Sequence, residues 1–162
     1  MQDNKINKKL SIIAFSGDFD KLTAVFTLAS GAASVGYEVN LFFTFWGLNA
    51  IKREKKRAPV GKSILAKIFG FFMGGLRVAP VSRLNFCGIS PTIFRYMMKK
   101  QNTPTPEDLL QASIALGVNF YACEMAMNVL GLDKNDLLPE VKEILGVASF
   151  LHLSENGQTL FI

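Results

Sequence analysis

Residues 117–132 change character halfway, and this change constrains the fold more than any other feature of the chain. The first half opens with Gly117 and is rich in β-branched and aromatic residues, which indicates a buried strand. The second half has apolar residues at 125, 126, 129 and 130, the spacing of one helix face. Cys123 stands at the junction. The stretch therefore predicts a strand that passes directly into a helix at a cysteine.

The position of Cys123 suggests a chemical role for its thiol. In an α/β fold such a junction lies at the carboxyl edge of the sheet, where ligands bind, and at the amino end of a helix, whose free N–H groups attract anions. That environment favours the thiolate, the reactive form of cysteine, although a carboxylate of Glu124 turned inward would oppose it by like-charge repulsion. We therefore hypothesise that Cys123 is a reactive thiolate. The alternative is an inert cysteine that packs as a small hydrophobic residue.

Length and composition predict one domain with an apolar surface to bury. The chain has 162 residues, of which 49% are hydrophobic, and we place one domain over residues 9–162 behind a disordered polar tail, residues 1–8. This apolar fraction indicates a sheet covered on both faces or a surface buried between subunits, so we expect a homo-oligomer. A spanning helix is not expected, because Lys67 and Arg77 bound the most apolar stretch. The polar, lysine-rich start has no apolar signal segment, which predicts a cytoplasmic location.

The net charge of +5 comes largely from that start and from the run 52–57. We interpret the run as a solvated face rather than a docking patch for an acidic partner, and we expect no binding to nucleic acid. A membrane-surface role is a weaker alternative. The run flanks the Phe- and Met-rich residues 64–79, but Lys67 and a pair of glycines interrupt the amphipathic pattern. The same apolar residues could instead form a subunit interface or a lid.

The N-terminal third predicts two parallel strands joined by a helix. Residues 10–15 are short and apolar and end in a turn, as a central strand does. A helix capped by Asp18 or Asp20 follows and ends at Gly36, and a second strand occupies residues 37–44. So short a connection predicts a right-handed parallel crossover.

The aromatic residues 45–49 follow this second strand and, by the same geometry, lie at the carboxyl edge beside Cys123. They could cover a pocket over the thiol, or Trp46 could simply pack in the core, and both interpretations stay open. The candidate pocket residues come from the turn after the first strand, from this segment and from the helix that follows the cysteine: Ser16, Gly17, Asp18, Phe45, Trp46, Gly47, Glu124 and Met125.

The rest of the chain mostly predicts helices. Prolines 59, 80 and 91 divide residues 58–100 into two or three short helices without a clear strand. Thr105 as cap, Pro106 and Asp108 mark the start of a helix that runs to Leu116. Further on we expect a broken helix over residues 133–145, a helix over 147–154 and a last apolar strand over 159–162.

Several familiar site patterns are missing from the sequence. Residues 61–63 end like a phosphate-binding loop, but the first glycine of that motif would fall at position 56, which is Lys. Two distant cysteines and one histidine do not make a metal site, so we expect neither a metal nor a cofactor. His152 is expected to face solvent rather than act as a base. Cys87 could approach Cys123 as a resolving thiol, but nothing in the sequence fixes the distance between them, so this is the weaker interpretation.

Five segments carry a family resemblance: 43–47 after the second strand, 122–127 around the cysteine, 131–132 after it, 146–148, and the terminal 160–162. They resemble DsrE/DsrF-like sulfur-relay proteins over nearly the whole chain, in particular the branch called DsrE family or peroxiredoxin-like. The resemblance implies a three-layer α/β/α sandwich with a mostly parallel sheet of about four to five strands. It also implies a homo-oligomer.

The resemblance further implies that the family cysteine, here Cys123, carries sulfur as a persulfide. Cys87 matches no family cysteine, and the chain lacks the Thr-Pro grouping that peroxiredoxins place before theirs. We therefore expect an intracellular sulfur carrier or sulfurtransferase. Its partners would be sulfur donors and acceptors, either proteins or low-molecular-weight persulfides. The alternative is a non-catalytic module that docks a protein or a membrane through residues 64–79.

Overall fold

Five parallel strands form the centre of the molecule. The computed structural model describes residues 8–53, 74–82 and 90–162. Its sheet has the strand order β4-β3-β2-β1-β5, and every neighbouring pair is parallel. The predicted α/β class and mostly parallel sheet are thus confirmed. The strands are β1 (Lys9–Ala14), β2 (Glu38–Phe43), β3 (Asn119–Cys123), β4 (Val141–Leu145) and β5 (Gln158–Phe161).

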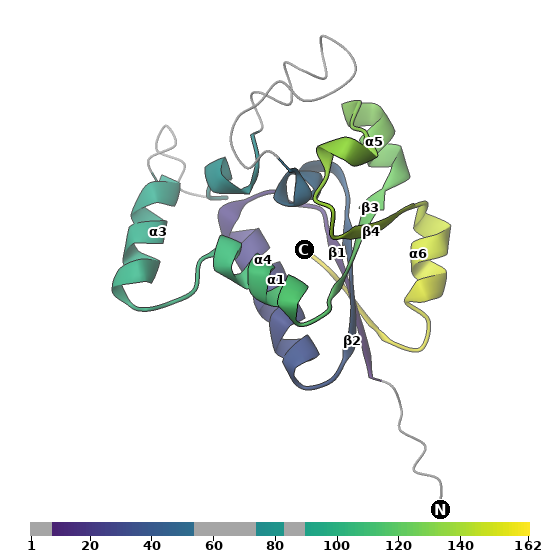
Figure 1. Ribbon diagram of the computed structural model, residues 1–162, viewed down its shortest axis with the longest axis horizontal. Helices are drawn as coiled ribbons and strands as arrows, with labels where there is room; N and C mark the ends of the chain where they lie inside the picture. The colour runs from purple at the N-terminus through teal and green to yellow at the C-terminus, as the bar shows by residue number, and fades with distance from the viewer. Residues whose placement is uncertain (1–7, 54–73, 83–89) are drawn as a thin grey trace, which may run out of the picture.

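Helices cover both faces of the sheet and so form the expected three layers (Figure 1). α1 (Phe19–Ser34) and α4 (Pro106–Ala115) lie together on one face, and α6 (Val147–Leu153) lies on the other. Phe43 of β2 contacts Phe26 of α1 with ring centroids 6.2 Å apart, whereas Phe42 stacks on Phe150 of α6 at 4.5 Å. Because consecutive strand residues point to opposite faces, β2 is buried on both.

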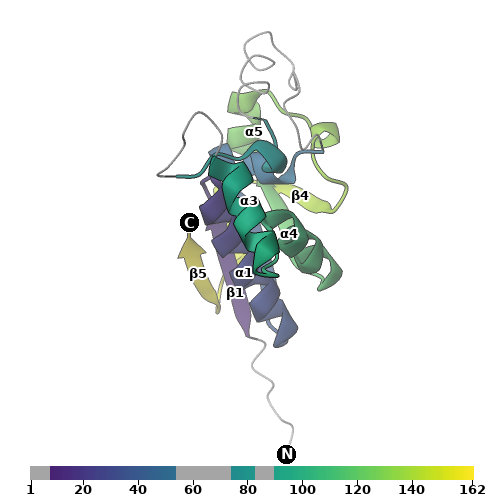
Figure 2. The same ribbon diagram turned by 90° about the vertical axis from the view of Figure 1, so that its left-hand side faces the viewer.

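The remaining elements lie at the margins of these layers. α3 (Ser90–Lys100) is held beside α4 by an ion pair, Arg95 to Glu107, at 2.8 Å (Figure 2). α5 (Glu124–Leu130) lies beyond the carboxyl edge of the sheet (Figure 1). Three short 3₁₀ helices complete the described residues: η1 (Phe45–Ile51), η2 (Leu76–Val78) and η3 (Lys134–Asp136).

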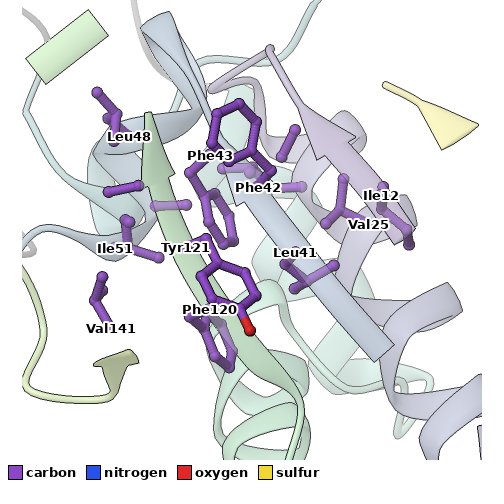
Figure 3. Close-up of a cluster of buried hydrophobic side chains, with 14 of the residues drawn as sticks. Ile12, Val25, Leu41, Phe42, Phe43, Leu48, Ile51, Phe120, Tyr121 and Val141 are labelled. Carbon is purple, nitrogen blue, oxygen red and sulfur yellow. The ribbon is translucent and has the colours of Figure 1, made fainter. Parts of the chain in front are cut away.

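Large apolar side chains of the central strands fill the core (Figure 3). Phe43 and Phe120 stack with parallel rings 5.9 Å apart, and Ile12 and Leu41 are fully buried. Each such side chain contributes about 1.5–3 kcal/mol when it is removed from water. This packing holds the carboxyl ends of β1, β2 and β3 next to one another, which is where the candidate site lies.

The start of α1 is fixed by polar contacts that the sequence only partly predicted. Asp18 is the residue before the helix, as expected, but its carboxylate accepts from Ser16 Oγ at 3.0 Å and makes no capping bond. Asp20 accepts from Ser82 Oγ at 2.6 Å and from Ser82 N at 3.0 Å. Burial alone would raise the pKa of Asp20, but these hydrogen bonds outweigh it and lower the pKa. Residues 80–82 are thereby tied to α1.

The broken helix expected over residues 133–145 is wrong. Asp133 and Asp136 form a capping box that closes only η3, and residues 141–145 form the edge strand β4 beside β3. Pro139 lacks the N–H that a continuing helix needs, and the exposed Lys142 and Glu143 suit a sheet edge. The apolar spacing that suggested a helix is shared between a turn and a strand.

One predicted helix, α5, has a different buried face from the one expected. In α5 the buried residues are Ala126 and Met127, while Met125 and Val129 are 54% and 68% exposed. In α6 the sheet-facing residue is Phe150, and His152 points to solvent as expected. A helix of seven residues contacts its support along a narrow strip, so apolar spacing alone did not identify that strip.

Some predictions concern residues outside the described ranges. The predicted tail, apart from Lys8, is one, and the apolar residues at 69, 71, 72 and 73 are another. Within 74–82 and 90–100 the structure shows η2 and α3, in keeping with short helices. Among the described helices, none has the length and apolar character needed to cross a membrane.

The capping box of α4 yields the first prediction. Thr105 Oγ1 accepts from Asp108 N at 3.3 Å, and Asp108 Oδ2 accepts from Thr105 Oγ1 and N, which lowers the pKa of Asp108. Thr105→Ala should lower the free energy of unfolding by about 1 kcal/mol. Because the pKa of Asp108 is depressed in the folded state, the loss should be complete above pH 3.8 and shrink as the pH falls through the folded-state pKa. Thermal unfolding at two pH values measures it. Thr103→Ala, at an exposed position, is the control and should change little.

Candidate functional site

Cys123 occupies the junction that the sequence predicted. It is the last residue of β3 and the residue that precedes α5, with φ −74° and ψ 117°. Its strand partner is Leu145 of β4. Since the sheet is parallel throughout, the junction lies at the same edge as the ends of β1 and β2.

The thiol of Cys123 is free but buried. The residue is 1% exposed, and its side chain makes no capping hydrogen bond to the N–H groups of α5. A reagent can therefore reach the sulfur only after the covering residues move. The hypothesis of a reactive thiolate consequently requires a second, more open conformation, whereas the alternative of an inert core cysteine does not.

The residues that follow Cys123 point away from it. Glu124 is exposed, so its carboxylate is hydrated rather than turned inward against the sulfur. Met125 is 54% exposed. In this conformation neither side chain covers the thiol, although both were candidate pocket residues.

The turn after β1 and the segment after β2 are in direct contact, as a shared pocket wall would require. Gly47 N donates to the carbonyl oxygen of Phe15 at 2.9 Å. A Cβ on Gly17 would lie 2.5 Å from the carbonyl oxygen of Trp46, and one on Gly47 would overlap the carbonyl of Ala14. Both positions therefore need glycine, because the two backbones approach too closely for a side chain.

The aromatic residues of this contact lie at the surface. Trp46 is 41% exposed, so the interpretation that it packs in the core is wrong for this chain. Phe15 lies between Phe45 and Phe161, with ring centroids at 5.4 and 5.7 Å. η1 then continues away from β1 and packs against α5. The structure thus brings residues 16–18 to Phe45, Trp46 and Gly47, and the far part of η1 to the helix that starts at Cys123.

Two buried polar residues, Asn49 on η1 and Lys52 directly after it, were missed by the sequence analysis. Asn49 is 7% exposed, and its Oδ1 is buried without a hydrogen-bond partner. Lys52 is 4% exposed, so the interpretation of this residue as part of a solvated face is wrong. Burial lowers the pKa of Lys52, and the opposing attraction of Asp136 does not compensate. The one sequence signal that could have indicated this burial is the apolar residue before each of them, Leu48 before Asn49 and Ile51 before Lys52.

A second polar cluster lies at the opposite end of the sheet. Ser11, Asn40 and Asn119 are cross-strand neighbours, and Asn119 Nδ2 donates to Asn40 Oδ1 at 3.0 Å. Beside them, a shallow depression of about 330 Å³ is bordered by Gly117, Glu140 and other residues. It lies about 13 Å from Cys123 along β3, so it does not serve the thiol. Within the described ranges, no three His, Cys, Asp or Glu side chains gather as metal ligands do.

Comparison with known proteins gives a consistent assignment. The model of the DsrE/DsrF/DrsH-like family matches residues 6–161. The chain belongs to that family. The sulfur carrier protein DsrE2 of Allochromatium vinosum is 28% identical over 167 aligned positions, which cover 96% of this chain and 98% of that protein. The uncharacterised protein YrkE of Bacillus subtilis is 40% identical over 157 positions, 96% of this chain and 97% of its own.

A solved structure supports the fold of this DsrE-like chain. The crystal structure of the ychN protein from E. coli has a TM-score of 0.52 and 13% identity, and the match covers 95% of this chain and 97% of that one. At that identity the similarity concerns the fold alone. The resemblance to the DsrE/DsrF-like family that the sequence segments carried is thus confirmed.

The burial of Cys123 under a short helix leads to a second prediction. Met127 is 3% exposed and is one of two buried side chains that anchor α5. Met127→Ala should loosen α5 and speed the alkylation of Cys123 by iodoacetamide about tenfold, because local opening becomes easier. Peptide mass spectrometry over time gives the rate. Val129→Ala, 68% exposed on the same helix, is the matched control and should leave the rate unchanged. Equal rates in all three proteins would mean that α5 does not control access.

Proposed function

We propose that this chain is a sulfur carrier that holds sulfane sulfur as a persulfide on Cys123 and passes it to an acceptor thiol. Membership of the DsrE/DsrF/DrsH-like family and similarity to a protein named as a sulfur carrier support a sulfur-relay role. The observation that assigns this role to one residue is the position of Cys123 in the fold. Cys123, the free cysteine of the described residues, stands where a strand meets a helix at the ligand-binding edge of a parallel sheet.

The transfer needs only thiol exchange. The thiolate of Cys123 attacks the outer sulfur of a donor R–S–SH, a new S–S bond forms, and R–S⁻ leaves as the donor S–S bond breaks. The product is Cys123–S–SH. An acceptor thiolate then takes the outer sulfur by the same step and regenerates the Cys123 thiolate. No oxidant or reductant is consumed, since one S–S bond replaces another. A reducing cytoplasm would keep the thiol available between cycles.

Burial of the sulfur suits storage and makes opening necessary. A persulfide held at 1% exposure would be shielded from water and oxidants. Loading and unloading would then require α5 to move, and α5 is held by few buried side chains. We propose that Ser16, Gly17, Asp18, Phe45, Trp46 and Gly47, with Glu124 and Met125, line the opened pocket. The close backbone contacts of Gly17 with Trp46 and of Gly47 with Phe15 would give the moving helix a fixed wall.

A homo-oligomer is part of the proposal, and the exposed aromatic residues favour it. A cluster of three aromatic rings lies at the carboxyl edge of the sheet and consists of Phe15, Phe45 and Phe161. Phe161 is 67% exposed. It belongs to β5, an edge strand with every residue exposed. An apolar cluster beside an unpaired strand edge is typical of a surface that another subunit covers.

The alternative of a docking module that uses residues 64–79 gains little from the described part of that segment. Residues 64–73 lie outside the described ranges. Of the rest, Gly74, Gly75, Leu76 and Ala79 are buried, so they offer no apolar surface to a protein or a membrane.

The third prediction tests the carrier role. After incubation with polysulfide, wild-type protein should gain about one sulfur atom on the peptide that contains Cys123, because the thiolate accepts sulfane sulfur. Cys123→Ser should gain none, and Cys87→Ser should gain as much as wild type. Peptide mass spectrometry with labelled sulfur provides the measurement. If Cys123→Ser still accepted labelled sulfur from a persulfide donor, the carrier assignment would be wrong.

The fourth prediction tests the assembly. Phe161→Lys places a charge in the aromatic cluster, so it should shift the protein to a smaller species in light scattering. Val35→Lys, at a 71% exposed position at the end of α1, should not change the mass. A monomeric wild type, or a mass that is the same in both variants, would contradict an oligomer built through this cluster.

A further inference from the structure

The inference concerns two buried polar residues, Asn49 of η1 and Lys52, the residue that follows η1. We infer that they form a recognition site, next to Cys123, for a small donor of the amino-acid or peptide thiol class, with a carboxylate for Lys52 and an N–H group for Asn49. The inference rests on the proposed function, because it names the kind of donor that would load the same thiol. Two observations support it: the position of these residues, and the hydrogen-bond partners that their polar atoms lack.

The backbone around Asn49 and Lys52 is held from both sides. Gly47 N donates to the carbonyl oxygens of Phe15 and Thr44, each at 2.9 Å, at the start of η1. At its end Ile51 O accepts from Leu138 N at 2.8 Å, and Arg53 N donates to Asp136 O at 2.9 Å. The two residues are therefore presented by a rigid segment, as a preorganised site requires.

Asn49 offers an acceptor with no donor. It is 7% exposed, and its Oδ1 is buried without a hydrogen-bond partner. Buried side-chain oxygens nearly always accept at least one hydrogen bond, so an orphaned one needs a reason. A bound molecule that brings an N–H group would supply the missing donor.

Lys52 offers a cation with no hydrogen-bonded anion. The residue is 4% exposed, and among the described residues its Nζ makes no hydrogen bond and no ion pair. Asp136 attracts it through space, but the cost of burial is larger, which is why the pKa of Lys52 is lowered. An anion that binds at Nζ would stabilise the charged form of Lys52, which burial destabilises.

The two groups lie on the same side of η1. They are three residues apart, and in a 3₁₀ helix three residues make one turn, so the side chains are stacked one above the other. Lys52 keeps a helical φ of −69° although its ψ of 140° ends the helix, so its Cβ follows the helical direction. One small molecule can therefore contact both.

The path from these two residues to Cys123 runs along η1. η1 begins after β2, the neighbour of β3, and packs against α5, whose preceding residue is Cys123. Figure 3 shows Leu48 and Ile51 of η1 beside β3. A ligand anchored at Lys52 and Asn49 would therefore extend along η1 toward the strand–helix junction, and its sulfur could meet Cys123 once α5 opens.

A ligand that pairs with both an acceptor and a cation must carry an N–H group and an anionic group. A cysteine-type persulfide carries a carboxylate and an ammonium or amide N–H on one carbon, which matches Lys52 and Asn49 Oδ1. Thiosulfate and inorganic polysulfide have negative charge but no N–H group. A persulfide within a protein chain has no free carboxylate next to its sulfur. The site therefore favours a small organic donor over both.

The fifth prediction uses S-methyl-L-cysteine, which has the carboxylate and the ammonium group but no sulfane sulfur that could be transferred. Full-length wild-type protein should bind it saturably by ligand-observed NMR. Asn49→Leu and Lys52→Met should each bind it about tenfold more weakly, because each loses one hydrogen bond that a charged group takes part in. Lys134→Met, which removes an exposed lysine on η3, is the matched control and should bind as wild type does.

A second measurement holds even if a variant fails to fold. S-methyl-L-cysteine amide, which lacks the carboxylate, should bind wild-type protein about tenfold more weakly than the acid. Equal binding of acid and amide, folded variants that bind like wild type, or no saturable binding would each overturn the inference. Loading of Cys123 by polysulfide is measured separately. If loading succeeds and binding fails, the carrier role stands without this site, and if binding succeeds and loading fails, the site stands without the carrier role.

Discussion

The burial of β2 on both faces is the constraint from which the rest of the structure follows. Phe42 packs under α6 and Phe43 under α1, so one strand joins the two helical layers through adjacent residues. A strand buried on both faces is typical of a parallel sheet whose connecting helices cover the faces, and both neighbours of β2 are parallel to it. Parallel neighbours end at one edge. The turn after β1, the 3₁₀ helix after β2 and Cys123 after β3 therefore lie together.

That edge is rigid on one side and weakly held on the other. The backbones of the β1 turn and η1 touch at Gly17 and Gly47, where a Cβ would not fit. α5, in contrast, buries only Ala126 and Met127 and leaves most of its surface in water. Local opening follows the element with the fewest buried contacts. A thiol at the start of such a helix can be sheltered most of the time and become accessible when the helix opens.

The sequence alone predicted the structure correctly where a pattern of residues is compatible with a single structure. The strands around Ile12 and Leu41 and the helix start at Thr105 were predicted nearly to the residue, because buried runs and a capping box have few alternatives. It was insufficient where tertiary packing decides. Residues 141–145 have a helical apolar spacing, yet they pair with β3, and Pro139 separates them from any preceding helix.

The candidate site shows the same division. Position along the chain placed Cys123 at a strand–helix junction, because that depends on local pattern. It could not show that the sulfur is 1% exposed, because burial depends on what α5 and η1 cover. Lys52 stands in a run of charges and looks solvated, and only the return of the chain through Leu137 buries it. Burial of a polar group is a property of the contacts around it rather than of its own residue type.

The contrast between Cys123 and its polar neighbours argues for function at this edge rather than packing alone. A buried thiol is tolerated in a core without any compensating partner. The orphaned amide oxygen of Asn49 is not, because it has lost the hydrogen bond that water would supply. Asn49 lies on η1, which packs against the helix of Cys123, and Lys52 follows η1 directly. Proteins keep polar groups that cost stability chiefly at functional sites, which is why the unpartnered oxygen of Asn49 argues for function at this edge.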